Sequence, residues 1–376
     1  MSTITPADPL IGIVPAAIGT LKNHQTDIPR IAKDPRLITM IEDAVRTVPT
    51  RHEIRLGDAR DLAAIPDESV HLIVTSPPYW TLKEYRKSDG QLGYVEDYDR
   101  FLAELDKVWA HCQRVLVPGG RLIIVVGDVC LSRRQNNGRH TVVPLHASIQ
   151  EHCRVIGFDN VAPIIWYKIA NAVYEVENRG GFLGKPFEPN AVVKNDIEFI
   201  LMQRKHGGYR SPSLSARVLS VISGDNHQKW FQQIWTDVTG ASTRNHPAPY
   251  PAELAERLVR MFSFVGDTVL DPFLGTGTTT VAAMRWGRNS IGVEVDPHYL
   301  ELAAKRIGDE NSNLFSTATI SVVQPGRKKR GASRPRVSGD QVVLESANGK
   351  HAERKDDGRS NRPARRDPSR KRVRKG

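Results

Sequence analysis

The segment TSPPYW, Thr75 to Trp80, directly follows the apolar run VHLIV and is the first place where chemistry is expected. Pro77 and Pro78 each fix φ near −65° and lack a backbone N–H. The Ser76 hydroxyl and the Pro77 carbonyl therefore face few competing donors, and two aromatic residues end the segment. We interpret it as a rigid, acceptor-lined elbow at the end of a strand, suited to hold a group that donates hydrogen bonds.

A second segment, LDPFLGTGTTTVAAMRWGRNSIGVEVDPHY at Leu270 to Tyr299, has the order strand, glycine turn, helix, strand and acidic pair. Gly275 and Gly277 would let the backbone approach a ligand, and the helix start presents unpaired N–H groups. Glu294 and Asp296 follow the second strand, where a carboxylate can accept hydrogen bonds from ribose hydroxyls. The pattern predicts a nucleoside-cofactor site, and the alternative is an ordinary strand-to-helix turn.

The glycine turn departs from the dinucleotide fingerprint. That fingerprint requires GxGxxG, whereas this sequence reads GTGTTT, with Thr280 in place of the third glycine. The departure argues against NAD as the cofactor.

The residues and the order of these segments resemble the motifs of the S-adenosylmethionine-dependent amino-methyltransferases of DNA. The resemblance is to the group in which the catalytic motif precedes the cofactor motif, the beta-class order. The segments that carry the resemblance are TSPPYW, DPFLGTGTT at Asp271 to Thr279, HPAPYP at His246 to Pro251 and LGD at Leu56 to Asp58. The resemblance covers about two thirds of the chain. It implies S-adenosyl-L-methionine as cofactor and double-stranded DNA as partner.

The resemblance also implies a role for each matched residue, and no metal is expected. The implied catalytic residues are Ser76, Pro77, Pro78 and Tyr79. The implied cofactor-binding residues are Asp58 near the adenine ring, Asp271, Phe273, Gly275 and Gly277 around the methionine moiety, Thr278 and Thr279 at the helix start, and Glu294 on the ribose hydroxyls. Secondary candidates for the wall of the methionine end are His246, Pro247 and Pro249.

The elbow suits this chemistry because an exocyclic amine is a poor nucleophile, its lone pair being delocalised into the base. Acceptors at Ser76 and Pro77 could take its hydrogens and hold it in line with the methyl group. The base must leave the duplex stack, at a cost of a few kcal/mol. Stacking on Tyr79 could offset roughly 1–3 kcal/mol of that cost, and Trp80 could widen the stacking surface.

The target atom follows from the cysteines and from the first residue of the motif. Methylation of cytosine C5 needs a thiolate in a Pro-Cys context, but Cys112, Cys130 and Cys153 follow other residues. Their spacing also matches neither a metal site nor a disulfide framework. Ser76, where related enzymes carry Ser or Asp, favours cytosine N4 over adenine N6. The alternatives are methylation of RNA or of a protein glutamine amide, and a non-catalytic DNA-binding module.

The elements that must position these motifs alternate between strand and helix from about residue 54 onward, which predicts helices on both faces of a parallel sheet. The expected fold is therefore α/β, a Rossmann-like seven-stranded mostly parallel methyltransferase sheet. The expected strands are Glu53–Asp58, Val70–Ser76, Arg121–Asp128, Val161–Lys168, Asp196–Gln203, Thr268–Phe273 and Ser290–Asp296. The expected helices lie at about 98–115, 142–156, 251–264, 278–287 and 297–307, with a short one near 37–47.

The domain boundaries follow from these elements and from composition. We expect an N-terminal extension at 1–50, a catalytic half at 51–204, a target-recognition segment at 205–245, a cofactor half at 246–310 and a basic disordered tail at 311–376. The donors expected to read DNA are Arg204, Lys205, His206, Tyr209, Arg210, Arg217, Asn226, His227, Gln228, Lys229 and Arg244, with help from the loop at 171–195. Trp230 and Trp235 are expected to form a small core in that segment.

The formal charge of +11 is concentrated at the C-terminus, where residues 311–376 carry 18 Lys and Arg against 6 Asp and Glu. Such a segment is either a solubilising tail or an electrostatic arm for nucleic acid. No run of apolar residues reaches the roughly 20 needed to span a membrane, so a cytoplasmic location is expected. A cognate restriction endonuclease is an expected partner, although a solitary enzyme would have the same motifs.

Overall fold

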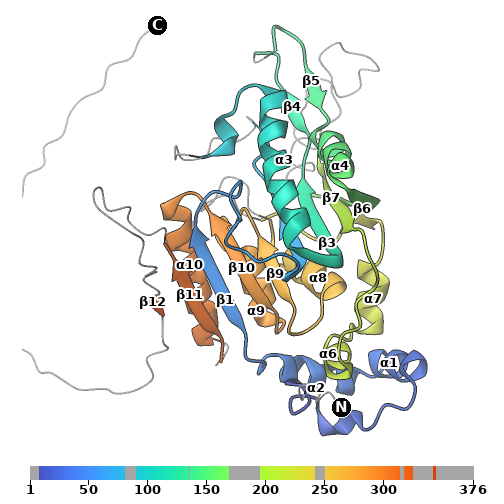
Figure 1. Ribbon diagram of the computed structural model, residues 1–376. Coiled ribbons are helices and arrows are strands. Elements are labelled where there is room, and N and C mark those ends of the chain that lie inside the picture. Colours follow the sequence, from blue (N-terminus) through green and yellow to red (C-terminus); the bar gives the residue numbers. More distant parts are fainter. Residues whose placement is uncertain are drawn as a thin grey trace, which may run out of the picture. The chain divides into compact units, whose positions relative to one another are not determined.

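The computed structural model (Figure 1) describes residues 8–80, 90–134, 136–168, 195–241, 250–313, 317–324 and 342–343. The strands are β1 Arg51–Leu56, β2 Val70–Thr75, β3 Leu116–Val126, β4 Val129–Leu131, β5 Thr141–Val143, β6 Phe158–Tyr167, β7 Ile197–Lys205, β8 Ile234–Trp235, β9 Thr268–Asp271, β10 Asn289–Glu294, β11 Thr319–Val323 and β12 Val342–Val343. The α-helices are α1 His24–Ala32, α2 Pro35–Val45, α3 Tyr98–Val115, α4 Leu145–Ile156, α6 Leu214–Leu219, α7 Gly224–Trp230, α8 Ala252–Phe262, α9 Thr278–Arg285 and α10 Pro297–Asn313. Short 3-10 turns lie at Ala16–Ile18 and Leu92–Tyr94.

One mixed, mostly parallel sheet forms the centre of the fold, in the strand order β12-β11-β1-β10-β9-β2-β3-β7-β6-β8. All seven expected strands lie in it, but the predicted number of seven is wrong, because β8, β11 and β12 extend the sheet to ten strands among the described residues. Each of these three strands is short. β8 and β12 have two residues each, too few for a periodic pattern to show.

The C-terminal boundary of the cofactor half also differs from the prediction. Helix α10 continues to Asn313, and β11 pairs in parallel with β1, with Ile320 opposite His52. Ile320 is buried against the α10 side of the sheet. The predicted tail beginning at residue 311 therefore contains part of the ordered sheet, and residues from 344 onward lie outside the described part.

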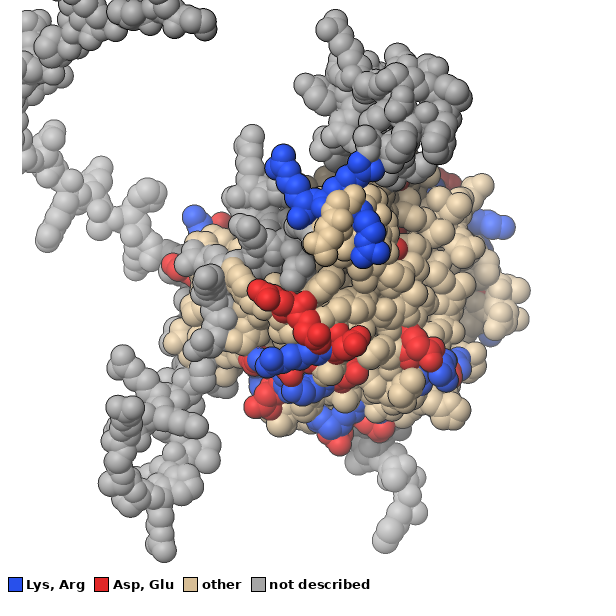
Figure 2. All heavy atoms as spheres, turned by 90° about the horizontal axis from the view of Figure 1, so that it is seen from above, with Lys and Arg blue, Asp and Glu red and all other residues tan. Residues whose placement is uncertain are grey.

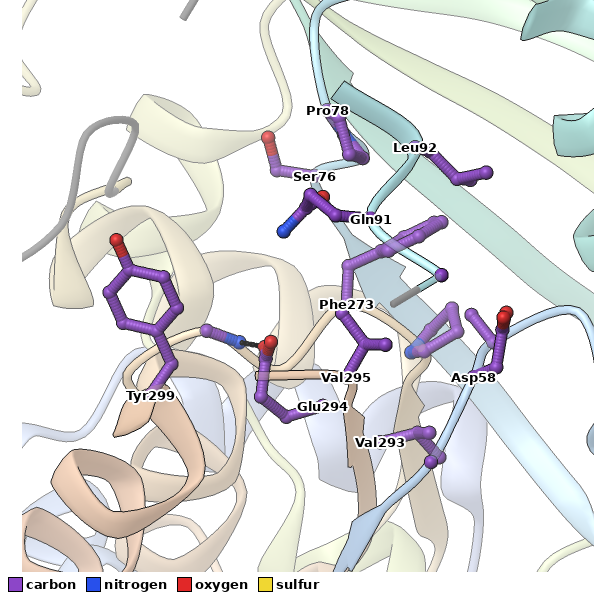
Figure 3. A pocket seen from close by; sticks show the side chains of 15 residues that line it. Asp58, Ser76, Pro78, Gln91, Leu92, Phe273, Val293, Glu294, Val295 and Tyr299 are labelled. Carbon is purple, nitrogen blue, oxygen red and sulfur yellow. Dashed lines mark hydrogen bonds between the residues drawn. The ribbon is translucent and has the colours of Figure 1, made fainter. Parts of the chain in front are cut away.

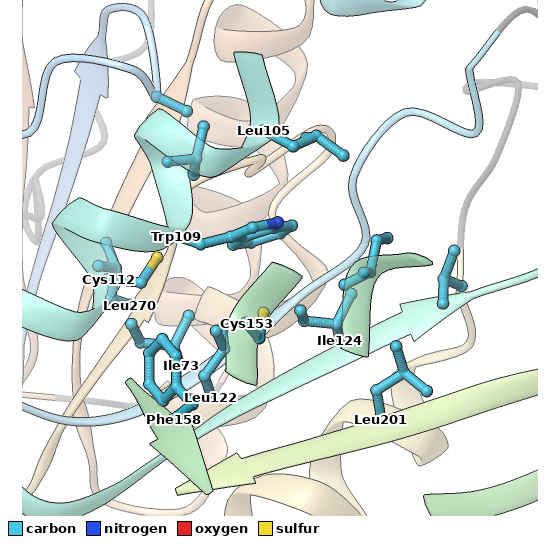
Figure 4. Packing of buried hydrophobic residues seen from close by; sticks show 14 of the residues in the cluster. Ile73, Leu105, Trp109, Cys112, Leu122, Ile124, Cys153, Phe158, Leu201 and Leu270 are labelled. Carbon is cyan, nitrogen blue, oxygen red and sulfur yellow. The ribbon is translucent and has the colours of Figure 1, made fainter. Parts of the chain in front are cut away.

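Both faces of the central strands are covered by helices, because alternate residues of each strand point to opposite faces. Ile73 of β2 and Leu122 of β3 pack under α3 and α4 together with Trp109 and Cys153, as Figure 4 shows. Leu72 and the other strand residues that point to the opposite face pack against α8 and α9. This two-sided burial explains why the strand sequences are almost continuously apolar.

Strands β9 and β2 are neighbours although about 200 residues separate them in the chain. They pair in parallel, with Leu72 opposite Val269 and Ile73 opposite Leu270. The carboxyl ends of β2 and β9 therefore lie side by side at the same edge of the sheet, and each strand ends within three residues of its paired positions. This is the junction of the two halves of the domain, the kind of place where open α/β sheets bind ligands.

The N-terminal helices lie at the opposite edge of the sheet, with α6 beside α2 (Figure 1). Helix α2 confirms the short helix expected near residue 37. Its start is fixed by Asp34, whose side chain accepts hydrogen bonds from the backbone N–H groups of Arg36 and Leu37. Ile38 and Ile41 of α2 are buried against Val218 and Leu219 of the α6 region.

A search of the helices within the described ranges found none with the length and apolarity that crossing a membrane requires.

Candidate functional site

A pocket opens where β1, β2, β9 and β10 end (Figure 3). Its lining residues are Gly57, Asp58, Ala59, Ser76, Pro78, Gly90, Gln91, Leu92, Pro272, Phe273, Gly275, Val293, Glu294, Val295 and Tyr299. Both chemical segments predicted from the sequence thus contribute walls to one cavity.

Asp271, the last residue of β9, joins the two segments from behind the pocket. Its carboxylate accepts hydrogen bonds from the Thr75 hydroxyl at 2.7 Å, the Thr279 hydroxyl at 2.6 Å and the Phe273 N–H at 3.0 Å. The Tyr250 hydroxyl lies 3.2 Å away. Burial raises the pKa of Asp271 above its ordinary value, while the hydrogen bonds oppose this shift.

The implied role of Asp271 around the methionine moiety stays a prediction. The side chain is 1 % exposed and is not one of the residues that line the pocket. Its partners are instead the residue preceding Ser76, the turn after β9 and the start of α9. Asp271 therefore organises the site and does not form its wall.

The glycine turn presents its backbone to the pocket at Gly275. This residue has φ of 53°, a left-handed value that favours glycine, and its N–H donates to Glu294 Oε2 at 2.8 Å. Gly277 also has a positive φ of 80°, but it lies behind the pocket, where a Cβ would come within 3.1 Å of Ile307 Cδ1. Only the first glycine is placed to touch a ligand.

Glu294 ends β10 on the floor of the pocket (Figure 3). Its Oε1 accepts the backbone N–H of Asp296 at 2.9 Å, so each oxygen has one backbone donor and further lone-pair capacity. Burial raises its pKa to about 7, and the nearby Asp296 and Asp271 carboxylates contribute to this rise. A buried carboxylate with unused acceptor capacity suits a ligand that supplies hydroxyl donors.

The two threonines at the start of α9 are buried and do not line the pocket. Thr278 accepts a hydrogen bond from Arg306 Nη1 at 2.9 Å through its hydroxyl. Thr279 donates to Asp271 and also contacts the Tyr250 hydroxyl. Both threonines, which were predicted to bind the cofactor, therefore stabilise the glycine turn from its buried side.

Asp58 and Phe273 lie on another side of the pocket (Figure 3). Asp58 follows β1 and pairs with Arg60, whose Nη2 is 2.6 Å from Asp58 Oδ2, and Arg60 also contacts Glu104 at 2.5 Å. Phe273 packs edge-on against Trp109, with ring centroids 6.3 Å apart. The result is an apolar wall beside a fixed carboxylate.

The elbow places Ser76 and Pro78 in the pocket wall, whereas Pro77 and Tyr79 are buried and do not line it. Tyr79 is 5 % exposed, and its hydroxyl lies 3.2 Å from Glu198 Oε2 and 3.4 Å from the Val125 carbonyl. The ring of Tyr79 packs in the cluster beneath α3, and its role as a stacking platform stays a prediction.

Trp80 also differs from its predicted role. Its indole N–H donates to the carbonyls of Val95 and Glu96 at 2.9 and 3.1 Å, and its ring meets Tyr98 edge-on. Its φ is 48°. Trp80 fastens the elbow to the segment before α3 and does not widen a stacking surface.

His246, Pro247 and Pro249 lie outside the described residues, as does Arg244. The remainder of the predicted recognition segment is divided between different parts of the molecule. β7 runs antiparallel to β3, with Arg204 opposite Arg121, so the chain after β7 emerges at the edge opposite the pocket. There Arg210 forms two hydrogen bonds with Asp267, at 2.8 and 2.6 Å, just before β9 begins.

The first part of the expected target-recognition segment at 205–245 therefore lies at the edge opposite the pocket, and its role in recognition stays a prediction. α6, which carries Arg217, packs on the N-terminal helices at that opposite edge. Trp230 and Trp235 are core residues as predicted, 8 % and 1 % exposed, but they belong to the main core under α8 and not to a separate small one. The antiparallel strand β7, whose direction a sequence pattern does not reveal, causes this difference.

Several lining residues were not predicted from the sequence. Val293, Val295 and Pro272 flank predicted residues, so the motif could have indicated them. Gly90, Gln91 and Leu92 carry no recognisable signal and reach the pocket only through the path of the chain before α3. In the described ranges, no three His, Cys, Asp or Glu side chains are grouped as a metal site would require.

Residues 70–305 match the N6_N4_Mtase family model, described as DNA methylase. The sequence is 37% identical to the type II methyltransferase M.MjaI of Methanocaldococcus jannaschii over 74% of this chain and 98% of that protein. It is 35% identical to the type II methyltransferase M.MthZI of Methanothermobacter thermautotrophicus over 69% of this chain and 77% of that protein.

A solved structure agrees with the fold as well as with the sequence. The Thermus thermophilus protein TTHA0409, a candidate DNA modification methylase complexed with S-adenosyl-L-methionine, superimposes with a TM-score of 0.58. Its sequence is 53% identical, over 69% of this chain and 94% of that one. The mixed α/β sheet described above is thus shared with a methylase structure.

Proposed function

Because this chain belongs to the N6/N4 DNA methylase family, we propose that it transfers a methyl group from S-adenosyl-L-methionine to cytosine N4 in double-stranded DNA. The observation that carries the proposal is the Thr75–Asp271 hydrogen bond, which holds the acceptor elbow and the glycine turn around one pocket. Adenine N6 is the alternative target.

The donor set of the pocket fits S-adenosylmethionine. Glu294 has lone pairs left for ribose hydroxyls after accepting from Gly275 and Asp296. Phe273 and Asp58 would flank the adenine, one through an apolar surface and one through a carboxylate.

The cofactor supplies an activated sulfonium methyl group, so the protein needs no covalent intermediate. The Ser76 hydroxyl, half-buried in the pocket wall, would accept one hydrogen of the target amine, and the Pro77 carbonyl would accept the other. Such acceptors localise the nitrogen lone pair and align it for transfer. The hydrogen bond from Thr75 to Asp271 would position the neighbouring Ser76.

The preference for cytosine rests on Ser76, a neutral hydroxyl at the first position of the elbow. Digestion of methylated DNA to nucleosides, followed by mass spectrometry, distinguishes N4-methylcytosine from N6-methyladenine. We expect N4-methylcytosine. Finding only N6-methyladenine would replace the cytosine proposal with the adenine alternative.

The reaction itself is tested with purified protein, labelled S-adenosylmethionine and genomic DNA, with an RNA sample in parallel. We expect label in DNA and none in RNA. Ser76→Ala is the matched variant, which should bind the cofactor normally but transfer at least tenfold more slowly. Cofactor binding without any transfer to DNA would overturn the proposal.

We also propose that the modification protects a short sequence against a cognate restriction endonuclease. Its support is the similarity to type II methyltransferases. Sequencing that maps methylated bases in DNA exposed to the enzyme should return one recurrent short motif. Methylation scattered without a motif would contradict this part of the proposal.

A further inference from the structure

We propose that the β4–β5 hairpin, residues 129–143, is a DNA-binding element that contacts the duplex beside the pocket. This inference rests on the proposed function and adds to it the surface that recognises the partner. The first part of the expected recognition segment, directly after β7, emerges at the edge opposite the pocket. The hairpin lies at the same edge as the pocket, where a flipped base must enter.

The base of the hairpin adjoins the elbow. Gly127 precedes β4 by two residues, and a Cβ on it would lie 3.4 Å from Tyr79 Cε2. Asp128 is fixed by His146, whose Nδ1 is 2.6 Å from Asp128 Oδ1 and whose ring stacks on Phe199 at 3.7 Å. The hairpin therefore begins at a rigid point next to the catalytic segment.

The tip of the hairpin has a defined turn. Asn137 and Gly138 have left-handed φ values of 47° and 81°, as the Asn-Gly turns of hairpins require. The Gly138 N–H donates to the Arg133 carbonyl at 2.9 Å, and Asn136 Nδ2 donates to the Thr141 hydroxyl at 2.8 Å. The tip is thus a shaped projection, and in Figure 1 β4 and β5 lie at the top of the molecule.

The charge of the hairpin is of one sign. Its 15 residues, VCLSRRQNNGRHTVV, include three arginines and a histidine and no acidic residue. Arg133, Arg134, Arg139 and His140 are exposed. Within the described ranges neither Arg134 nor Arg139 forms an ion pair, unlike the exposed Arg154 of α4, which pairs with Glu151 at 2.6 Å.

The surface view agrees with this distribution. Figure 2, seen from above Figure 1, shows Lys and Arg side chains gathered around one projection, apart from acidic side chains nearer the centre of that face. A two-stranded ribbon fits the major groove, which is about 12 Å wide. Arginine and asparagine at its tip can contact phosphates and base edges alike.

The test replaces Arg134 and Arg139 together by alanine in the full chain. The matched control replaces Arg36 and Arg51, two exposed arginines at the opposite edge of the sheet, which removes the same charge. Binding is followed by the anisotropy of labelled duplexes of random sequence, about three helical turns long, at several salt concentrations. Methyl transfer to the same duplexes gives KM for DNA and for S-adenosylmethionine.

We expect the R134A/R139A variant to bind duplex at least tenfold more weakly, with KM for DNA raised and KM for S-adenosylmethionine unchanged. If both arginines contact phosphates, the salt dependence should lose a slope of about 2. The R36A/R51A control should resemble the wild type. Equal duplex affinity of the hairpin variant and wild type, or an equal loss in the control, would overturn the inference.

The test of the hairpin can be distinguished from the test of the proposed function. Failure of the wild type to methylate any DNA would overturn the proposed function, whereas the anisotropy comparison still tests the hairpin directly. Normal methylation by both the wild type and the hairpin variant would overturn the hairpin inference alone. An R134K/R139K variant that restores affinity would assign the contacts to phosphates.

Discussion

The hydroxyl of Thr75 donates a hydrogen bond of 2.7 Å to the carboxylate of Asp271, across 196 residues of sequence. Thr75 is the last residue of β2 and Asp271 the last of β9. Because both are buried, the bond is not shared with water, and its loss would leave Asp271 Oδ1 with only the Phe273 N–H as donor. Together with the pairing of β2 and β9, this contact holds the elbow beside the glycine turn.

Replacing Thr75 by valine removes that bond while keeping the side-chain shape. We expect the free energy of unfolding to fall by about 1–3 kcal/mol, since the buried Asp271 Oδ1 loses one of its two donors and keeps only the Phe273 N–H. The rate of methyl transfer should fall more than the affinity for S-adenosylmethionine, because Ser76 is displaced. Urea unfolding and single-turnover transfer measure the two effects.

The control for this change is Thr39→Val, which removes an exposed helix hydroxyl bonded to the Pro35 carbonyl. It should change neither the free energy of unfolding nor the rate of methyl transfer. A Thr75→Val enzyme with wild-type transfer and stability would show that the two halves are aligned without this contact.

Glu294 should make cofactor binding depend on pH. Its pKa in the ligand-free protein is raised to about 7, and ribose hydroxyls require the ionised form. Binding should therefore weaken about tenfold for each pH unit below that value. The Kd for S-adenosylmethionine, measured by calorimetry from about one pH unit above that pKa to about one unit below it, checks this. E294Q is expected to bind weakly and without pH dependence.

The same shift has a consequence for ligand-free stability. A carboxyl whose folded pKa is raised favours the protonated form, so its stabilising contribution is present below about pH 4.5 and is lost as the pH rises through about 7. Relative to E294Q, the wild type should lose stability over that interval. A pH-independent difference between the two proteins would contradict the assignment.

Tyr79 should behave as a core residue. It is 5 % exposed and packs in the cluster beneath α3, with its hydroxyl near Glu198. Tyr79→Ala should lower the free energy of unfolding by about 3–5 kcal/mol through the cavity it leaves. Tyr79→Phe, which removes one hydrogen-bonding group, should cost about 1 kcal/mol.

Denaturant unfolding of both variants distinguishes this role from base stacking. A Tyr79→Ala protein that kept its stability but lost transfer would indicate a ring that turns an open face to the base. Glu198 provides a further check, because it holds Lys168 at 2.6 Å as well as the tyrosine. Glu198→Gln should preserve the fold and shift Tyr79 only slightly.

Truncation of the C-terminus should have two outcomes, depending on where the chain is cut. A chain ending at Gln324 keeps β11 on β1 and should fold normally, with a salt dependence of DNA binding flatter than that of the full chain. A chain ending at Asn311 loses β11 and the buried Ile320, and it should unfold more easily. Thermal unfolding measures the stability of the two truncated chains, and the anisotropy of labelled DNA at several salt concentrations measures their DNA binding.

An unchanged salt slope after the cut at Gln324 would show that the basic residues beyond it do not contact DNA. Equal stability of the two truncated chains would contradict the structural role of β11.

The segments that build the pocket could be recognised from the order of residues along the chain. Local patterns identified seven strands, the elbow at Ser76 and the glycine turn at Gly275, because each depends on residues adjacent in the chain. Glu294 could be predicted for the same reason, since the strand that carries it ends at a recognisable acidic pair.

The tertiary structure was needed to show which of these residues face the pocket and which elements lie at the same edge of the sheet. Asp271, Thr278 and Thr279 read as ligand contacts in the sequence, but packing places them behind the turn. The antiparallel direction of β7 carries Arg210 to the far edge, and the β4–β5 hairpin stands beside the elbow instead. Strand direction and side-chain burial depend on contacts between residues far apart in the chain, and a local pattern of residue types does not contain them.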